Sequence, residues 1–215
     1  MPWIWNTFII FFAYIIGSIP NSLWIGRLFY NTDVRKHGSK NAGSTNTIRL
    51  LGYKAGIPVL LLDILKGWVA VKLIYLTDYH IPVSGDYINF QLLLGLAAIM
   101  GHIFPVFANF RGGKGVATLI GVILAIDPLS TLICLGVFMV TLLATKYVSL
   151  SSMIAGLSFP VLVIVVFNTT TPSLVIFSLI VFVLLLFTHQ KNIERLLSNE
   201  ESKANFLFRP GRKDG

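Results

Sequence analysis

The segment from His37 to Arg49 is rich in Gly, Ser, Thr and Asn, and it carries basic residues at both ends. Glycine permits backbone conformations that turn several N–H groups toward one point, and such nests bind anions, phosphate above all. Ser39, Asn41 and Asn46 add neutral donors, and the Arg49 guanidinium can grip a phosphate with two hydrogen bonds. This pattern predicts a phosphate-binding loop. The alternative is an ordinary loop whose basic residues serve only to orient the chain.

Glycine and lysine recur in a second segment, which reads Arg111-Gly112-Gly113-Lys114-Gly115. The nucleotide-binding pattern G-x-x-x-x-G-K-[ST] is absent and no strand precedes the segment, so a nucleotide triphosphatase is not predicted. A short glycine-rich loop with a lysine still suits a phosphate. Lys114 is therefore a second predicted phosphate contact, with chain orientation alone as the alternative. His102, nearby, can equally be a packed histidine at the membrane interface.

Two pairs of polar residues have the i, i+3 spacing that places them on one helix face. Asp63 and Lys66 lie within an apolar run, where charges are costly and mark a function or an ion pair. A structural pair is the favoured interpretation, although Lys66 is also a candidate to bind substrate. His189 and Asn192 follow the last apolar run, and an imidazole suits a general base near neutral pH. The alternative interpretation is that His189 and Asn192 belong to an amphipathic tail beside the membrane.

The scaffold that must position these groups has the composition of a lipid-embedded protein. Of 215 residues, 55% are hydrophobic and only 12% are charged, against roughly 25% in soluble domains, and the mean hydropathy is +0.78. A spanning helix needs about 20 apolar residues. We predict an all-α, polytopic integral membrane protein that forms a single domain over 1–215 and has about seven transmembrane helices. The apolar runs are 3–28, 56–77, 88–109, 115–127, 129–145, 149–167 and 172–188. Five or six helices with a re-entrant segment is the alternative.

Basic loops alternate with non-basic loops along the chain. Lys and Arg occur in 27–54, 110–114 and 146–148 and in the tail after His189, and they are missing from 78–87, 127–128 and 168–171. The positive-inside rule then predicts an outside N-terminus and a cytoplasmic C-terminus. Both glycine-rich loops and His189 fall on the cytoplasmic side. The net charge of +8 is accounted for by topology and anionic lipid, so no nucleic-acid partner is predicted. The acidic residues are scattered and Cys134 is the single cysteine, so no metal site is predicted either.

Seven stretches, in order along nearly the whole chain, resemble the motifs of the bacterial acyl-phosphate:glycerol-3-phosphate acyltransferases, the PlsY family. They are Gly17-Ser18-Ile19-Pro20, Asp33-Val34-Arg35, Gly38 through Asn46 with Arg49, Asp63-Ile64-Leu65-Lys66-Gly67, Gly101 through Pro105, Gly112 through Thr118, and His189 through Leu197. The chain departs from the family where Lys40 replaces the usual Gly, Ser44 replaces Ala, Arg27 replaces Lys and Gln190 replaces Arg.

This resemblance implies a seven-helix fold in the bacterial cytoplasmic (inner) membrane, with the active site on the cytoplasmic face. It implies transfer of a long acyl chain from acyl phosphate to the sn-1 hydroxyl of glycerol 3-phosphate, giving lysophosphatidic acid and phosphate. No metal, other cofactor or coenzyme A is implied.

The resemblance also suggests residue roles. The catalytic candidates are Ser39, Arg49, Lys114 and His189. The substrate-binding candidates are Ser39, Asn41, Asn46, Arg49, Lys66, Lys114 and Asn192. The first loop would hold the donor phosphate, and Arg49 with Lys114 would hold glycerol 3-phosphate. His189 and the donor's own phosphate are rival general bases.

A transporter of small phosphorylated anions is the alternative from another class. It explains the basic loops, but its polar groups would be expected near the middle of the membrane. Acyltransferases that use coenzyme A and a His-x-x-x-x-Asp motif are not favoured, because none of the four histidines has Asp five residues on.

Overall fold

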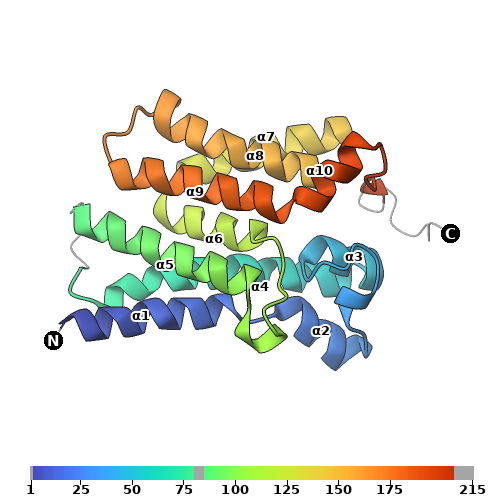
Figure 1. Ribbon diagram of the computed structural model, residues 1–215, viewed down its shortest axis with the longest axis horizontal. Helices are drawn as coiled ribbons and strands as arrows, with labels where there is room; N and C mark the ends of the chain where they lie inside the picture. The colour runs from blue at the N-terminus through green and yellow to red at the C-terminus, as the bar shows by residue number, and fades with distance from the viewer. Residues whose placement is uncertain (1, 80–84, 206–215) are drawn as a thin grey trace.

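The computed structural model describes residues 2–79 and 85–205, and within them the regular structure is helical, with no strand. The α-helices are α1 Pro2–Gly17, α2 Asn21–Tyr30, α3 Ser44–Leu51, α4 Tyr53–Lys72, α5 Gly85–Ile103, α6 Val116–Ile126, α7 Pro128–Thr145, α8 Val148–Val161, α9 Pro172–Thr188 and α10 Gln190–Leu197. Short 3₁₀ turns form η1 Val34–Lys36, η2 Leu73–Leu76 and η3 Val106–Ala108, and a π-helical turn forms η4 Leu162–Val166. The long helices lie alongside one another in a bundle (Figure 1). The predicted all-α fold is confirmed.

Three helices of the described chain are long and apolar enough to cross a membrane: Gly85–Ala108, Pro128–Thr145 and Val148–Val166. The number rises to five if two bent pairs, α1 with α2 and α9 with α10, each count as one span. The helix α4 has 20 residues but carries four charges. The helix α6 has 11 residues, or about 16 Å, which is roughly half the thickness of the hydrocarbon core.

The outer surface of the bundle suits lipid as its solvent. On α7, for example, Val140 is 70% exposed and Leu132 is 64% exposed. The protein is therefore an integral membrane protein. The count of seven spans and the orientation of the termini stay predictions. Part of the loop 78–87 lies outside the described residues, as do Arg209, Arg212 and Lys213 of the basic tail.

The first apolar run contains a break. A single helix over 3–28 is predicted from hydropathy, but α1 ends at Gly17 and α2 begins at Asn21, at an angle of 41°. Pro20 lies in the break. Proline has no N–H to donate and disfavours helix in the residue before it. The prediction of one continuous helix is therefore wrong, and the Ile19 carbonyl is left available to another partner.

The helices α1 and α5 approach each other closely through glycine. A Cβ at Gly101 would overlap the Tyr14 carbonyl oxygen, and a Cβ at Gly17 would overlap the Ala98 carbonyl oxygen. Small residues let backbones pack at short range where lipid gives no hydrophobic drive for association. This contact fixes the end of α5, from which the second glycine-rich loop leaves.

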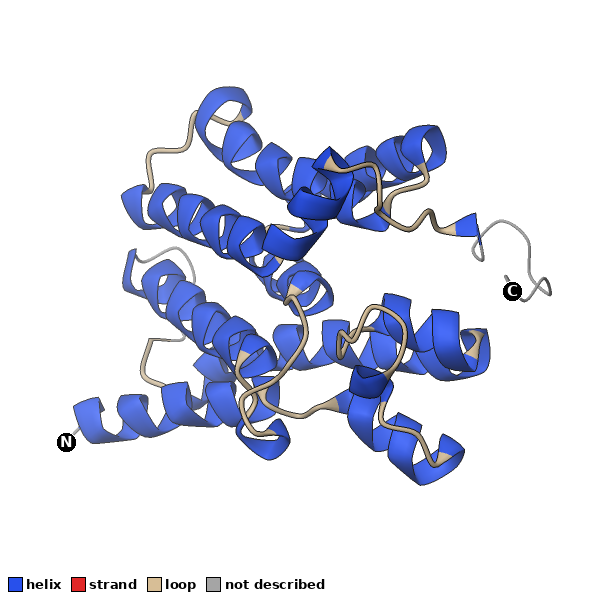
Figure 2. Cartoon of the chain, turned by 45° about the vertical axis from the view of Figure 1, so that its right-hand side comes forward, coloured by secondary structure: helices blue, strands red, loops and turns tan. Residues whose placement is uncertain are grey.

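The short helices and the polar loops gather at one end of the molecule. Figure 1 shows α2, α3 and α10 at the end of the bundle away from the N-terminus. Figure 2, turned by 45°, shows loops lying between the short helices at the same end. The fold thus brings together segments that are far apart in sequence.

Candidate active site

Asn46, in the first turn of α3, organises the first glycine-rich loop. Its Oδ1 accepts a hydrogen bond from the Ser39 backbone N–H at 3.0 Å. Its Nδ2 donates to three carbonyls, those of Val34 (2.9 Å), His37 (3.2 Å) and Asn41 (3.1 Å). Asn46 is buried, and its amide is engaged within the loop. The structure therefore places Asn46 beneath the predicted phosphate site rather than on its surface.

The backbone of this loop enters the left-handed region twice, at Gly38 (φ +57°) and at Lys40 (φ +58°). The N–H of Ser39 bonds to Asn46, and the N–H of Lys40 bonds to the His37 carbonyl at 3.0 Å. Two N–H groups expected in an anion nest are thus engaged inside the loop. The first turn of α3, which has no side-chain cap, offers N–H donors instead. Beside it, the Ser39 side chain is exposed.

The second glycine-rich loop is attached to the end of α5. The N–H of Gly112 donates to the Ile103 carbonyl at 3.1 Å, and that of Gly113 donates to the His102 carbonyl at 3.2 Å. Gly113 also lies against the His102 imidazole, where a Cβ would overlap Nε2. These contacts hold the backbone that carries Lys114.

Lys114 connects this loop to the corner between α9 and α10. Its Nζ donates to Oδ1 of Asn192 at 2.5 Å, and its carbonyl accepts a hydrogen bond from the Thr188 hydroxyl at 3.2 Å. Lys114 and Asn192, which were predicted from separate motifs, are therefore direct neighbours.

His189 lies at the same corner and is buried. Its Nδ1 is 2.8 Å from the Leu185 carbonyl. A carbonyl only accepts, so Nδ1 carries the hydrogen and the neutral ring keeps a lone pair on Nε2. This tautomer, assigned from the contact, is the one that a general base requires.

Glu201, which sequence reasoning missed, is the carboxylate of this site. Its Oε1 accepts hydrogen bonds from Ser149 and Asn192, both at 2.7 Å, and its Oε2 accepts one from Arg195 at 2.8 Å. Burial alone would raise the pKa of Glu201. The hydrogen bonds from Ser149, Asn192 and Arg195 outweigh burial and hold its pKa below the ordinary value.

The site contains more positive than negative charge. Burial lowers the pKa of Lys114 to about 8, with Glu201 opposing the shift and Arg195 and Arg49 adding to it. Burial likewise lowers the pKa of Arg49, again with Glu201 opposing and Arg195 adding. Lys114, Arg49 and Arg195 thus interact electrostatically with Glu201, and burial disfavours the charged forms of Lys114 and Arg49. An arriving phosphate would relieve that imbalance.

Lys66 lies in a buried pair on α4 with Asp63, whose Oδ1 is also 3.7 Å from Nδ1 of His102. Its Nζ is 2.8 Å from Oδ1 of Asp63 and donates to the Ile19 carbonyl, freed by the break between α1 and α2, at 2.9 Å. Nδ2 of Asn21 donates to the same Asp63 oxygen at 2.9 Å. The structural ion pair favoured from the sequence is confirmed. A substrate contact for Lys66 stays a prediction.

An apolar cavity of about 50 Å³ begins beside the second loop and runs between α6, α7, α8 and α9. Val116, two residues after Lys114, lines it, and Ile123 lines it two helical turns further along α6. The polar groups of Lys114 and His189 thus lie near one end of an apolar space.

Comparison with known proteins identifies the chain's relatives. The family model described as Glycerol-3-phosphate acyltransferase matches residues 7–199. A glycerol-3-phosphate acyltransferase of Listeria monocytogenes is 47% identical over 195 residues, which cover 91% of this chain and 94% of the relative. One of Chlorobium phaeobacteroides (strain BS1) is 40% identical, over 90% of this chain and 94% of the relative.

Two solved structures also match. The glycerol 3-phosphate form of PlsY, an integral membrane glycerol 3-phosphate acyltransferase, superposes with a TM-score of 0.83 at 34% identity, over 94% of this chain and 97% of that chain. Its lysophosphatidic acid form superposes with a TM-score of 0.79, over 95% and 99%. Because sequence and fold agree over nearly the whole length, the chain belongs to the glycerol-3-phosphate acyltransferase family of PlsY-like membrane proteins.

Proposed function

We propose that this protein transfers a fatty acyl group from acyl phosphate to the sn-1 hydroxyl of glycerol 3-phosphate, at the cytoplasmic face of a bacterial inner membrane. The products are lysophosphatidic acid and inorganic phosphate. The observation that carries the proposal is the contact between Lys114 and Asn192, next to His189 and two residues before Val116, which lines an apolar cavity. This contact brings together the Lys114 cation, which suits a phosphate, the candidate base His189, and an apolar space for a hydrocarbon chain.

The two phosphates are assigned to different sides of the site. The Ser39 and Asn41 side chains, with the first-turn N–H groups of α3, hold the donor phosphate. Arg49 and Lys114 hold the phosphate of glycerol 3-phosphate, since the cation excess lies around them. Asn192 then orients the glycerol end. Asn46 supports the donor side by shaping its loop.

The reaction is an acyl transfer between oxygens. The sn-1 oxygen attacks the carbonyl carbon and forms the ester bond, and the bond from that carbon to the phosphate oxygen breaks. The departing phosphate is a good leaving group, so positioning and charge stabilisation supply most of the rate. The hydroxyl proton passes to Nε2 of His189 or to the donor's own phosphate.

The cavity along α6 has room for a few methylene groups of the acyl chain, and the rest of the chain lies in the lipid beside α7. The lining is almost wholly apolar, and on α7 Leu135 and Phe138 are partly exposed toward the lipid. A chain that enters from the bilayer therefore stays in hydrocarbon while its phosphate end reaches the polar loops.

The test is a reaction of the purified protein, in mild detergent, with palmitoyl phosphate and glycerol 3-phosphate. Phosphate release and lysophosphatidic acid are followed, with palmitoyl-coenzyme A as the parallel donor. Product from acyl phosphate alone is expected. Product only from the coenzyme A ester would reject the donor assignment. No product from either donor, with folded protein, would reject the reaction and call for a phosphate-ester flux assay in liposomes.

A further inference from the structure

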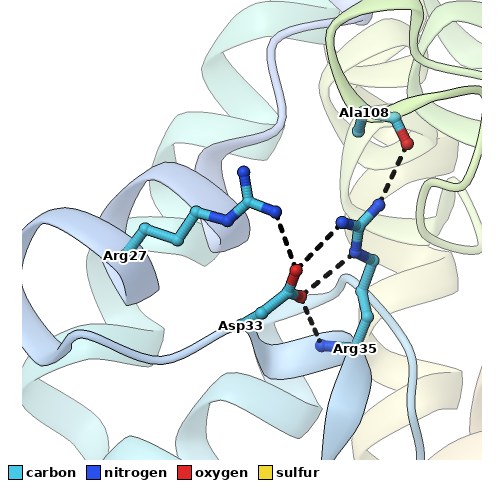
Figure 3. A network of polar contacts seen from close by, with 4 residues as sticks. All are labelled: Arg27, Asp33, Arg35 and Ala108. Atoms are coloured by element: carbon cyan, nitrogen blue, oxygen red, sulfur yellow. Dashed lines mark hydrogen bonds and ion pairs between the residues drawn. The ribbon is translucent and has the colours of Figure 1, made fainter.

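Asp33, at the start of the turn η1, holds two arginines from different segments (Figure 3). Its Oδ2 is 2.8 Å from Nη2 of Arg27, on α2, and 2.9 Å from Nη2 of Arg35. Its Oδ1 accepts from the Arg35 backbone N–H at 3.0 Å and from Nε at 3.1 Å. Hydrogen bonds from Arg35 keep the pKa of Asp33 well below its usual range, against the effect of burial.

Arg35 has one further contact, and it crosses to the second glycine-rich loop. Its Nη1 donates to the Ala108 carbonyl, on η3, at 3.0 Å (Figure 3). The planar guanidinium thus spans a carboxylate just before the first loop and a carbonyl just before the second, which a single point charge cannot do in the same geometry. Arg35 is 21% exposed and Asp33 12% exposed, so the bridge is largely shielded from water.

Two other observations show that the two loops are built as one unit. Val34 of η1 and Ala42 of the first loop pack with Ala108 of η3, just before the second loop, in a small apolar cluster that includes Leu23 of α2. Gly113 also lies close to the Ala42 carbonyl, since a Cβ there would be 3.1 Å from that oxygen.

The backbone just after Ala108 is strained. Asn109 and Phe110 have φ of +54° and +56°. For a bulky residue such as Phe110, this left-handed conformation is unusual and persists only where the surroundings hold it. The Ala108 carbonyl, where this turn begins, accepts hydrogen bonds both from Arg35 and from the Arg111 N–H at 3.2 Å. The turn then leads directly into the loop that carries Lys114.

We propose that the Asp33–Arg35 pair is a positioning device that sets the second loop, and so Lys114, for glycerol 3-phosphate. Arg35 sits at the edge of the donor-phosphate loop, yet its effect falls on the other substrate. Both loops have hydrogen bonds of their own, the first through Asn46 and the second through Gly112 and Gly113, and the Arg35 bridge adds a contact at the strained turn that leads to Lys114. The proposal rests on the substrate assignment made above.

The central test compares Arg35→Lys with Lys36→Met. Lys36 is the neighbouring exposed cation, and its substitution is expected to leave both Michaelis constants unchanged. Arg35→Lys keeps the positive charge beside Asp33 but loses the planar guanidinium that donates to both Asp33 and Ala108. We expect the Michaelis constant for glycerol 3-phosphate to rise about tenfold, within the range of mutations that act through neighbours. The constant for palmitoyl phosphate should change less than twofold.

A second variant protects the test against misfolding. Asp33→Asn keeps the shape of the side chain and weakens its hold on Arg35, so it should shift the same Michaelis constant in the same direction. Thermal midpoints in detergent are measured for every variant.

The results separate this inference from the proposed function. Unchanged glycerol 3-phosphate constants in folded Arg35→Lys and Asp33→Asn, beside a raised constant in Lys114→Met, would overturn the positioning role alone. Equal changes in both Michaelis constants that follow the loss of thermal stability would also overturn it. A wild-type protein without turnover would overturn both proposals.

Discussion

At the scale of single residues, the two ring nitrogens of His189 have different roles. Nδ1 donates to the Leu185 carbonyl, which leaves Nε2 to take a proton. If His189 is the base, His189→Gln should lower kcat about 10²- to 10⁴-fold, since glutamine cannot accept a proton at neutral pH. The Michaelis constant for glycerol 3-phosphate should change little.

The measurement is steady-state turnover of His189→Gln beside the wild type at about neutral pH. Substantial residual turnover would assign the proton to the donor phosphate instead.

Lys114 gives the site a pH dependence whose sign can be worked out. Its pKa is lowered to about 8 in the ligand-free protein, so the ammonium is present below that pH and is lost as pH rises through it. Only the ammonium attracts phosphate, hence kcat/KM for glycerol 3-phosphate should fall above about pH 8. A bound phosphate raises the pKa again, so the fall in kcat should lie at higher pH.

Lys114→Arg is the matched variant, because a guanidinium stays charged throughout this range. In Lys114→Arg, the fall in kcat/KM for glycerol 3-phosphate at alkaline pH should disappear. If the fall persists unchanged, another group is responsible.

At the scale of elements, the contact between α1 and α5 depends on a glycine. Gly101→Ala would place a methyl group against the Tyr14 carbonyl, and overpacking of this kind costs about 1–3 kcal/mol. Gly136, on α7, faces open space, since a Cβ added there would meet no neighbouring atom within 4 Å. Gly136→Ala should therefore be neutral or stabilising by up to about 1 kcal/mol.

Thermal midpoints of the two variants in the same detergent test this contrast. Equal midpoints would mean that α1 and α5 can separate at little cost.

Glu201 makes the segment after α10 part of the site. Glu201→Gln removes the charge that pairs with Arg195 and orients Asn192, so we expect a loss of about 1–3 kcal/mol and lower kcat. Because the pKa of Glu201 is lowered, its stabilisation is complete above the unfolded pKa and is lost as pH falls through the folded value. The difference between wild type and variant should thus shrink in acid.

Glu200→Gln is the control, since Glu200 is the exposed neighbour. A Glu201→Gln protein as stable and as active as Glu200→Gln would show that the segment only covers the site.

The element scale also shows what sequence can and cannot predict. The seven apolar runs correspond to helices because hydropathy and backbone satisfaction in lipid are local properties. The pairing of Asp63 with Lys66 follows from helical spacing for the same reason. The break between α1 and α2 was missed, although Pro20 signalled it, because the run stays apolar across it.

Long-range contacts were beyond such reasoning. Glu201 stands in a polar tail where an acidic residue normally faces water, and only the return of the chain past α10 brings it to Ser149 and Asn192. Asn46 was predicted from composition as a phosphate contact, but loop closure places its amide inside the loop. By contrast, the sequence motifs predicted that Lys114 and Asn192 share a site, and the two side chains form a hydrogen bond.

At the scale of the whole molecule, the charged loops give a topology that can be tested. We predict an outside N-terminus and a cytoplasmic C-terminus from the alternation of basic loops. A C-terminal fluorescent-protein fusion should fluoresce, and a C-terminal alkaline phosphatase fusion should be inactive. The opposite pair of results would place the C-terminus outside and overturn the predicted orientation.

The apolar cavity contains the only sulfur nucleophile in the protein. Cys134 is the single cysteine of the chain, and it lines the cavity that we assign to the acyl group. A neutral, membrane-soluble fluorophore attached to this thiol would report from one defined position, with no background from other sites. The wild-type sequence therefore needs no added cysteine for labelling, and the emission of the attached fluorophore would follow the entry and departure of hydrocarbon chains in real time.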